Sequence, residues 1–276
     1  MPAARPIVFL SDYGLESEFV GVCHSVIERI CPGAKVIDLT HAVPPQDVLR
    51  GAIMLSSAIP YLPPEAVVVA VVDPGVGTQR RPIAVETRAE KRLMVGPDNG
   101  LLALAWAAAG WINRAVEITS PAVILEPVSA TFHGRDIFAP AAAHLAAGLP
   151  LEELGPAVDV ASLEGLSVPE PAVGRDRVDC QVLSVDRFGN LQLSARPGHL
   201  QLAGLDAVPR LWLHAQGASL ELWKARTFGD VPEGQFALIE DSAGWLAIVL
   251  KKASAAQVLG LTANDPVTLL RAQAVA

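Results

Sequence analysis

The strongest constraint on the fold is an uninterrupted apolar run that ends in an acid and a glycine-rich turn. Residues 67–72, VVVAVV, are almost all β-branched and show no alternation of polar and apolar positions. Such a run predicts a strand buried on both faces, as in the parallel sheet of an α/β protein. The strand stops at Asp73, and Pro74, Gly75 and Gly77 then favour a tight turn. A carboxylate is therefore expected at the carboxyl end of a core strand, where open α/β sheets bind ligands.

The segment after this turn separates two interpretations. Asp73, Gly75 and Gly77 resemble the first motif of Rossmann-type methyltransferases, in which a glycine-rich turn opens onto a helix. Here residues 83–86, IAVE, predict a short strand without a helix cap. The loop is therefore expected to return to a strand and to bring Asp73 and Arg80 to one rim. The alternative is that Asp73 is a turn residue and Arg80 a surface charge.

Composition favours a globular protein that handles a small molecule. The chain has 276 residues, 51% apolar and 18% charged, which is enough for two domains with buried cores. A formal charge of −8 without any Lys/Arg-rich tract argues against a nucleic-acid partner. No apolar run approaches the ~18–20 residues that span a bilayer, so no membrane partner is expected.

The cysteines and the N-terminus bear on cellular location. Cys23, Cys31 and Cys180 are scattered, odd in number and without CxxC or Cys/His ligand spacing. This pattern argues against a disulfide framework and against a zinc site, and it fits a reducing compartment. Residues 1–6 are too short for a signal peptide. A cytoplasmic location is expected.

The chain opens with a βαβ pattern. Residues 7–10 predict a buried strand, and Asp12 follows it closely. Residues 18–30 carry apolar side chains at helical spacing, and residues 35–39 predict the next strand. Two predicted strands therefore end in an aspartate.

The loop at residues 40–47 contains two polar candidates. Asp47 is placed to cap a following helix. His41 is either a ligand group or, as is more common, a hydrogen-bonded loop histidine.

Further along, residues 92–95 predict a strand and residues 101–109 a helix. Trp106 and Trp111 are expected in the core rather than in a stacking platform.

A compact polar cluster precedes the next predicted helix. His133 and Arg135 flank Gly134, just ahead of an alanine-rich helix at residues 139–147. A plain core needs no such cluster, although a satisfied structural histidine is the alternative.

The composition changes between residues 158 and 177, which resemble an extended linker. The expected domains are an N-terminal α/β domain at 1–165 with a mainly parallel central sheet, a linker at 166–176, and a smaller C-terminal domain at 177–276. Short alternating strands are predicted in the last domain at 177–185, 191–194, 210–214, 220–225, 235–240 and 245–250. They indicate an antiparallel β-barrel-like domain.

Within that domain, the turn DRFGN at 186–190 is the segment least explained by folding alone, although Gly189 and Asn190 suit a hairpin turn.

Five ordered segments together resemble the S-adenosylmethionine (SAM) hydroxide adenosyltransferase family, also called SAM hydrolases, which are relatives of the fluorinase and chlorinase enzymes. The segments are SDYG at 11–14, VDPGVGT at 72–78 with Arg80, GPDNG at 96–100, TFHGRD at 131–136 and DRFGN at 186–190. The resemblance covers nearly the whole chain. It implies an α/β domain, a β-barrel-like domain, and a homotrimer with active sites between neighbouring subunits. It implies no cofactor and no metal.

By position, the resemblance assigns Asp73, Arg80 and His133 to the set that orients and polarises the attacking water. The sulfonium of SAM leaves as a neutral thioether, so no general acid is needed and the difficult step is to make water nucleophilic at C5′. Phe19 and Gln46 are expected to line the site.

The resemblance also assigns the substrate contacts. Asp12 matches the carboxylate that grips the ribose hydroxyls. Asp186 and Asn190 match the groups that hold the methionine end and the adenine side, and Phe188 is expected to pack near the base.

Two other functions stay open beside hydrolysis. The halogenases resemble this chain but carry a tyrosine where Asp73 stands and a serine near the position of His133 and Gly134. An acid at position 73 repels halide, which favours water. A non-catalytic SAM sensor would use the same pocket. The segments 242–245 and 251–252 depart from the halogenase pattern, so no adenine contacts are assigned there.

Overall fold

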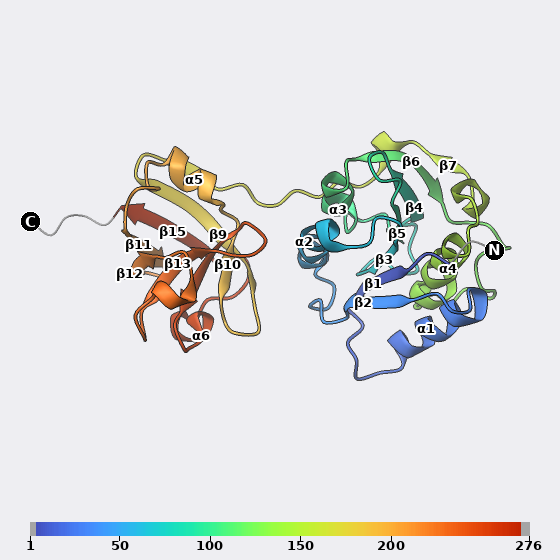
Figure 1. Ribbon diagram of the computed structural model, residues 1–276, viewed down its shortest axis with the longest axis horizontal. Helices are drawn as coiled ribbons and strands as arrows, with labels where there is room; N and C mark the ends of the chain where they lie inside the picture. Colours follow the sequence, from blue (N-terminus) through green and yellow to red (C-terminus); the bar gives the residue numbers. More distant parts are fainter. Residues whose placement is uncertain (1–3, 272–276) are drawn as a thin grey trace, which may run out of the picture. The chain divides into compact units, whose positions relative to one another are not determined.

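The structure is a computed structural model that describes residues 4–271. The chain divides into two compact units, one ending at Ser167 and the other beginning at Val168 (Figure 1). The limits 1–165, 166–176 and 177–276 stay a proposal for where the independently folding domains begin and end.

The first unit is built on one mixed sheet with strand order β2-β1-β3-β5-β4-β6-β7. Its strands are β1 (Ile7–Ser11), β2 (Val36–Thr40), β3 (Val67–Val71), β4 (Pro82–Thr87), β5 (Leu93–Pro97), β6 (Ile112–Glu117) and β7 (Ala157–Val158). Pairing is parallel from β2 to β5 and antiparallel from β5 to β7. The expected α/β domain is confirmed, with parallel pairing confined to β2, β1, β3 and β5, among which β3 carries the central apolar run.

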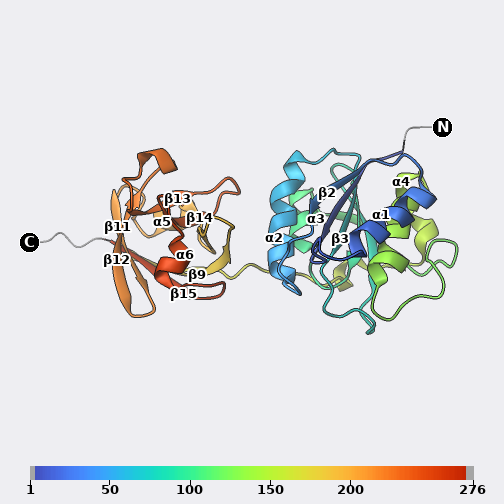
Figure 2. The same cartoon turned by 90° about the horizontal axis from the view of Figure 1, so that it is seen from below.

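Helices cover both faces of this sheet (Figure 2). They are α1 (Phe19–Ile30), α2 (Val48–Ala58), α3 (Ala103–Ala108) and α4 (Ala139–Ala146), with 3₁₀ turns η1 (Ile59–Tyr61), η3 (Leu151–Leu154) and η4 (Val160–Ser162). The helices α1 and α4 pack on one face against Val67, Val69 and Val71. The helices α2 and α3 pack on the other face, against Val68 and Ala70. Because successive strand residues face opposite layers, an unbroken apolar run is what a doubly covered strand requires.

The parallel strands bring a set of polar side chains to one edge of the sheet. The strands β1, β2, β3 and β5 run in the same direction, so their carboxyl ends meet at this edge. The residues that follow these strands are Asp12, His41, Asp73 and Asp98.

The turn after β3 depends on a glycine. Gly77 has a φ of +76°, and a Cβ there would lie 2.4 Å from the carbonyl oxygen of Ala130. Only glycine fits this position without moving the backbone. The chain then enters β4 and not a helix, as the sequence predicted.

The second unit is a closed barrel. Its strands are β8 (Ala172–Gly174), β9 (Arg177–Val185), β10 (Leu191–Leu193), β11 (Arg210–Ala215), β12 (Ala218–Lys224), β13 (Phe236–Glu240), β14 (Leu246–Leu250) and β15 (Pro266–Arg271). Short helices α5 (Pro197–Leu202) and α6 (Ala255–Leu259) and the 3₁₀ turn η5 (Phe228–Asp230) lie between them. The strand β10 pairs with both β14 and β9, which closes the ring, and β8 adds to β9.

The barrel is confirmed, but three of its features were not predicted. The pair β12–β13 is parallel, because the connection at 225–235 carries the chain back before β13 begins. The strand β15 was not predicted either, and β8 lies inside the expected linker.

Most predicted elements of the first unit lie within two residues of their expected bounds. Asp47 caps α2 by accepting a hydrogen bond from the Arg50 amide (2.9 Å). The prediction for Trp106 is confirmed, whereas that for Trp111 is wrong, since its side chain is 64% exposed. Trp111 has a φ of +69° in the turn after α3, which directs it away from the core. Across residues 4–271, no helix combines the length and hydropathy needed to cross a bilayer.

Candidate active site

Asp73, Arg80 and His133 come together at the strand edge, from segments far apart in the sequence. Asp73 follows β3, Arg80 lies at the end of the turn before β4, and His133 precedes the π-helical turn η2 (Gly134–Phe138). Arg80 Nε donates to Asp73 Oδ1 (3.1 Å) and Arg80 Nη2 donates to Asp73 Oδ2. Arg80 Nη2 also lies 3.0 Å from His133 Nδ1. The guanidinium thus joins the acid to the imidazole.

This contact determines which nitrogen of His133 carries the proton. A guanidinium only donates hydrogen bonds, so Nδ1 of His133 must be the accepting, unprotonated nitrogen. In neutral His133 the proton is therefore on Nε2. Burial, and then the positive charge of Arg80, lower the pKa of His133 below its usual value, while Asp73 and Asp136 act against this shift. The imidazole is thus neutral at pH 7.

The Asp73–Arg80 pair is almost fully desolvated. The two side chains are only 6% and 7% exposed. The guanidinium carbon of Arg80 lies 5.3 Å from the ring centroid of Phe138, in a cation–π contact. Arg80 Nη1 is buried and has no hydrogen-bond acceptor among the described protein atoms. This donor is available to a ligand oxygen, which is the arrangement expected of a binding site rather than of a structural ion pair.

Tyr13 packs directly against this group and was not identified as a site residue from the sequence. A Cβ at Gly134 would lie 2.0 Å from the Tyr13 hydroxyl oxygen, so glycine is required beside His133. Burial raises the pKa of Tyr13 well above its usual value, and the charges of Asp12 and Asp73 act in the same direction. Tyr13 therefore stays a neutral hydroxyl beside the acid. The quoted segment SDYG contained it, but its position opposite Gly134 required the fold.

Tyr13 packs in a cluster of aromatic rings. The ring centroid of Tyr13 lies 5.8 Å from that of Phe19 and 5.8 Å from that of Phe132. Phe19, which was expected to line the site, is 41% exposed at the start of α1.

Asp12 lies at the same edge of the sheet, next to Tyr13. Its Oδ2 accepts a hydrogen bond from the Gln46 amide (2.9 Å). Gln46 adopts a φ of +65°. The structure thus brings together Asp12 and Gln46, which the sequence analysis assigned to the site separately.

In the barrel unit, Asp186 organises the turn that was expected to contact substrate. Its Oδ1 accepts from the amides of Phe188 (2.8 Å) and Asn190 (2.9 Å), and its Oδ2 accepts from Asn190 Nδ2 (2.8 Å). The carboxylate is therefore committed to the turn itself, in an Asx-type arrangement. It holds Phe188 so that its ring is 73% exposed.

This turn forms one side of a pocket of about 520 Å³. The residues lining it are Phe188, Asn190, Phe228, Leu250, Lys252, Ala253 and Ser254. Two aromatic rings face a mostly apolar space with an amide and a hydroxyl, which suits a flat heterocycle. Phe228 and Ser254 were missed because they lie far from the turn in sequence, and no local pattern marks them.

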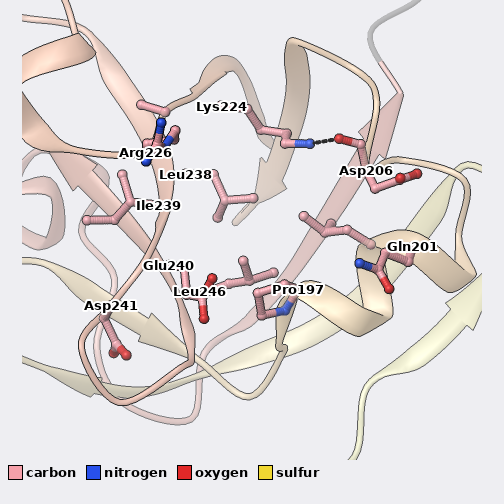
Figure 3. Close-up of a pocket in the computed structure, with 12 residues that line it drawn as sticks. Pro197, Gln201, Asp206, Lys224, Arg226, Leu238, Ile239, Glu240, Asp241 and Leu246 are labelled. Atoms are coloured by element: carbon pink, nitrogen blue, oxygen red, sulfur yellow. Dashed lines mark hydrogen bonds between the residues drawn. The ribbon is translucent and has the colours of Figure 1, made fainter.

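A second pocket of the barrel, of about 430 Å³, has no aromatic side chain among the described residues that line it (Figure 3). Lys224 Nζ there donates to the carbonyl oxygens of Asp206 and Leu205. Asp241 accepts from the amides of Ala243 and Trp245 and from Gln192 Nε2. These polar groups are used to hold loops of the barrel.

The first unit contains four of the predicted site residues, Asp12, Asp73, Arg80 and His133. The second unit contains the other three, Asp186, Phe188 and Asn190. One chain thus combines an acid–arginine–histidine group at a sheet edge with an aromatic pocket in a β-barrel, which is typical of a two-domain protein that acts on a small molecule. Residues 7–155 match the SAM hydroxide adenosyltransferase N-terminal domain, and residues 180–268 match the C-terminal domain of the same name. The chain belongs to the SAM hydroxide adenosyltransferase family.

The relatives of this chain include proteins named as SAM hydrolases and proteins named as fluorinases. An (R)-S-adenosyl-L-methionine hydrolase from Salinispora arenicola is 48% identical, over 94% of this chain and 95% of the relative. A fluorinase from Actinoplanes sp. is 30% identical over 99% of this chain and 100% of its own. The crystal structure of an uncharacterized conserved protein from Thermotoga maritima has a TM-score of 0.88 at 38% identity, covering 96% of this chain and 100% of that protein.

The lowered pKa of His133 predicts a specific pH dependence of stability. A histidine in the unfolded chain has a pKa of about 6.5 and takes up a proton more readily than His133 does in the folded protein. His133 therefore lowers the free energy of unfolding as the pH falls below that value. His133→Asn keeps an acceptor for Arg80 but removes the titration. We expect its free energy of unfolding in urea to fall less than that of the wild type between pH 7.5 and pH 5.5.

His214, exposed on β11, provides the matched control. His214→Asn should retain the wild-type pH profile. Equal pH dependence of the wild type and His133→Asn would contradict the lowered pKa.

Proposed function

We propose that this protein hydrolyses S-adenosyl-L-methionine to adenosine and L-methionine, by attack of water or hydroxide at C5′, without a metal or cofactor in the reaction. The observation that carries the proposal is the buried group of Asp73, Arg80 and His133. Family membership and the relatives named as hydrolases support it.

The hydrogen bonds around Arg80 favour Asp73 as the group that receives the proton of water. The ring lone pair of His133 is on Nδ1, which Arg80 already occupies. The carboxylate oxygens of Asp73 each accept one bond from Arg80 and keep further lone pairs. His133 Nε2–H and the unpartnered Arg80 Nη1 are donors that can hold the oxygen of the water.

Positioning and base assistance are the whole of the catalytic task. The leaving thioether is neutral and needs no proton. General-base assistance is worth roughly 10²–10⁴ in rate, and alignment of the water with C5′ adds to it. A desolvated acid–guanidinium pair is rigid enough to provide both.

The substrate contacts in this proposal come from both units. Asp12, held by the Gln46 amide, binds the ribose hydroxyls. Phe188 and Asn190 contact the adenine side from the pocket that Phe228 also lines. Asp186 contributes by holding the turn in shape, and the methionine end is expected to lie near it.

We also propose that the protein is a homotrimer with its active sites between neighbouring subunits. Supporting this proposal, the water-activating group lies in the first unit and the aromatic pocket in the second. Light scattering should give three times the 29.0 kDa mass of the chain. A monomer mass at micromolar concentration would contradict the trimer.

The cytoplasm is the proposed location. Cys23, Cys31 and Cys180 are free thiols, and burial raises the pKa of Cys23 and Cys180 to about 12. Unpaired, unreactive thiols are usual in a reducing compartment.

A product assay tests the proposed reaction directly. The purified protein is incubated with SAM and EDTA, once without halide and once with excess chloride or fluoride, and the products are separated by chromatography. We expect adenosine in equal yield from both. A 5′-halo-5′-deoxyadenosine would place the protein with the halogenases, and bound, unchanged SAM would make it a sensor.

Substitution of Asp73 tests the role of the acid. Asp73→Asn should lower kcat by roughly 10²–10⁴ with little change in SAM binding. Asp73→Ala should in addition lower the free energy of unfolding by about 3–5 kcal/mol, because buried Arg80 loses its partner. Turnover and calorimetric binding of SAM measure the two effects.

Asp98 provides a matched control, since it is also a buried acid bound by an arginine. Its side chain is 3% exposed, and Arg81 Nε donates to it at 2.9 Å. Asp98→Asn should lose stability and keep its kcat. Wild-type kcat in Asp73→Asn, or an equal loss of kcat in Asp98→Asn, would remove the role of Asp73.

A further inference from the structure

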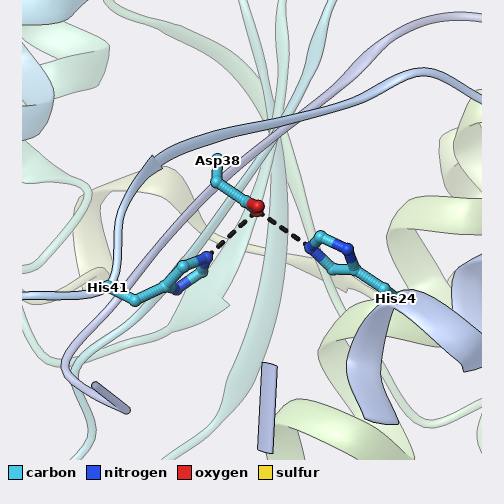
Figure 4. Close-up of side chains that lie close together, drawn as sticks. All are labelled: His24, Asp38 and His41. Atoms are coloured by element: carbon cyan, nitrogen blue, oxygen red, sulfur yellow. Dashed lines mark hydrogen bonds and ion pairs between the residues drawn. The ribbon is translucent and has the colours of Figure 1, made fainter. Parts of the chain in front are cut away.

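A second group of polar side chains lies at the β2 side of the sheet and takes no part in the proposed reaction. It consists of His24 on α1, Asp38 on β2 and His41 just after β2 (Figure 4). Figure 4 shows both imidazoles directed at the carboxylate of Asp38. His24 Nε2 lies 2.9 Å and His41 Nε2 lies 3.0 Å from the same oxygen, Oδ1.

These distances are close to those of a metal site. One potential ligand atom from each of the three residues lies within 4.8 Å of the others. Bonds to zinc of about 2.0–2.2 Å place neighbouring ligand atoms roughly 3.3 Å apart in a tetrahedron. The two contacts to Asp38 are already near this separation, whereas the ligand atoms as a set lie up to 4.8 Å apart, so rotation of the imidazole side chains would be needed to bring all three atoms to one ion.

The ring of His41 is fixed in orientation by its packing and by a hydrogen bond, as is usual for a histidine that binds a metal ion. Its ring is 4% exposed and stands edge-on to Phe9, with centroids 4.8 Å apart. His41 Nδ1 lies 2.7 Å from Ser11 Oγ, so a proton on Nδ1 has an acceptor and Nε2 is free to bind a cation. Such a hydrogen bond from the second ring nitrogen is the common means of orienting a ligating imidazole.

The outer side of the group is open to solvent. The side chains of His24 and Asp38 are 34% and 41% exposed. An ion can therefore enter from water and keep water in its remaining coordination positions, with no large movement of the fold.

We propose that His24, Asp38 and His41 bind one divalent transition-metal ion, with Zn²⁺ as the best fit. Two imidazoles and one carboxylate favour borderline cations such as Zn²⁺ over Mg²⁺ and Ca²⁺, which prefer oxygen ligands. Cysteine spacing argued against zinc, but this group contains no cysteine and forms only when α1 packs beside β2.

The ion would act on structure, at a place connected to the candidate active site. The carbonyl oxygen of His41 accepts from the Gly14 amide (2.8 Å), and Ser11 Oγ accepts from the Tyr13 amide (3.2 Å). The segment from Ser11 to Gly14 carries Asp12 and Tyr13. Metal binding at His41 is therefore expected to stabilise this segment without taking part in the chemistry.

Metal titration tests the proposal without measuring turnover. Untagged, EDTA-treated and dialysed protein is titrated with Zn²⁺ by calorimetry, and with Co²⁺ by its visible absorption. We expect one ion per chain, a Co²⁺ spectrum of nitrogen and oxygen ligands, and a Tm that rises up to one equivalent of Zn²⁺. Millimolar Mg²⁺ should leave the Tm unchanged.

Ligand variants locate the ion. His24→Gln and Asp38→Asn should each weaken Zn²⁺ binding at least about 10-fold, while His214→Gln, in the barrel, should bind as the wild type does. His24 is half-exposed, so its variant is expected to fold, which circular dichroism checks.

Absence of stoichiometric Zn²⁺ binding would overturn the proposal. So would wild-type affinity in both His24→Gln and Asp38→Asn, because the ion would then lie elsewhere. Since neither readout involves SAM, the metal site and the hydrolase proposal can fail independently.

Discussion

The site depends on one buried cation, the guanidinium of Arg80. Removing it from water is costly, and the cost is offset only where its donors meet the carboxylate of Asp73, the ring nitrogen of His133 and the face of Phe138. Each partner comes from a different segment, so the strand edge, the turn at Gly77 and the π-helical turn η2 must all be in place. In return, the guanidinium fixes the tautomer of His133 and orients the carboxylate of Asp73.

The mixed sheet makes this edge different from that of a Rossmann-type site. In a Rossmann-type site, the turn after the strand leads to a helix whose N-terminus binds the ligand. Here the turn leads to β4, which inserts antiparallel between β5 and β6. Side chains, and not backbone amides of a helix, therefore provide the donors and acceptors at the end of β3.

The two units contribute different chemistry. The first supplies charged groups from rigid strand ends, whereas the barrel supplies an aromatic pocket whose shape is set by the carboxylate of Asp186. That carboxylate accepts three hydrogen bonds within the turn, and its contact with substrate stays a prediction. Beside these groups, His24, Asp38 and His41 form a second polar cluster at the β2 side of the same sheet.

The sequence by itself determined the elements, because hydrophobic period and turn residues are local. The run at 67–72, the return to β4 and the cap at Asp47 are examples, and the ordered motifs named Asp73, Arg80 and His133 as one set. Local sequence patterns did not predict contacts between distant segments. Tyr13 opposite Gly134, Phe228 beside Phe188, the exposed Trp111 and the parallel pair β12–β13 depend on how finished elements pack. Only the tertiary structure decided the proton position on His133, since a hydrogen bond is set by distance and direction in space, which local sequence patterns do not specify.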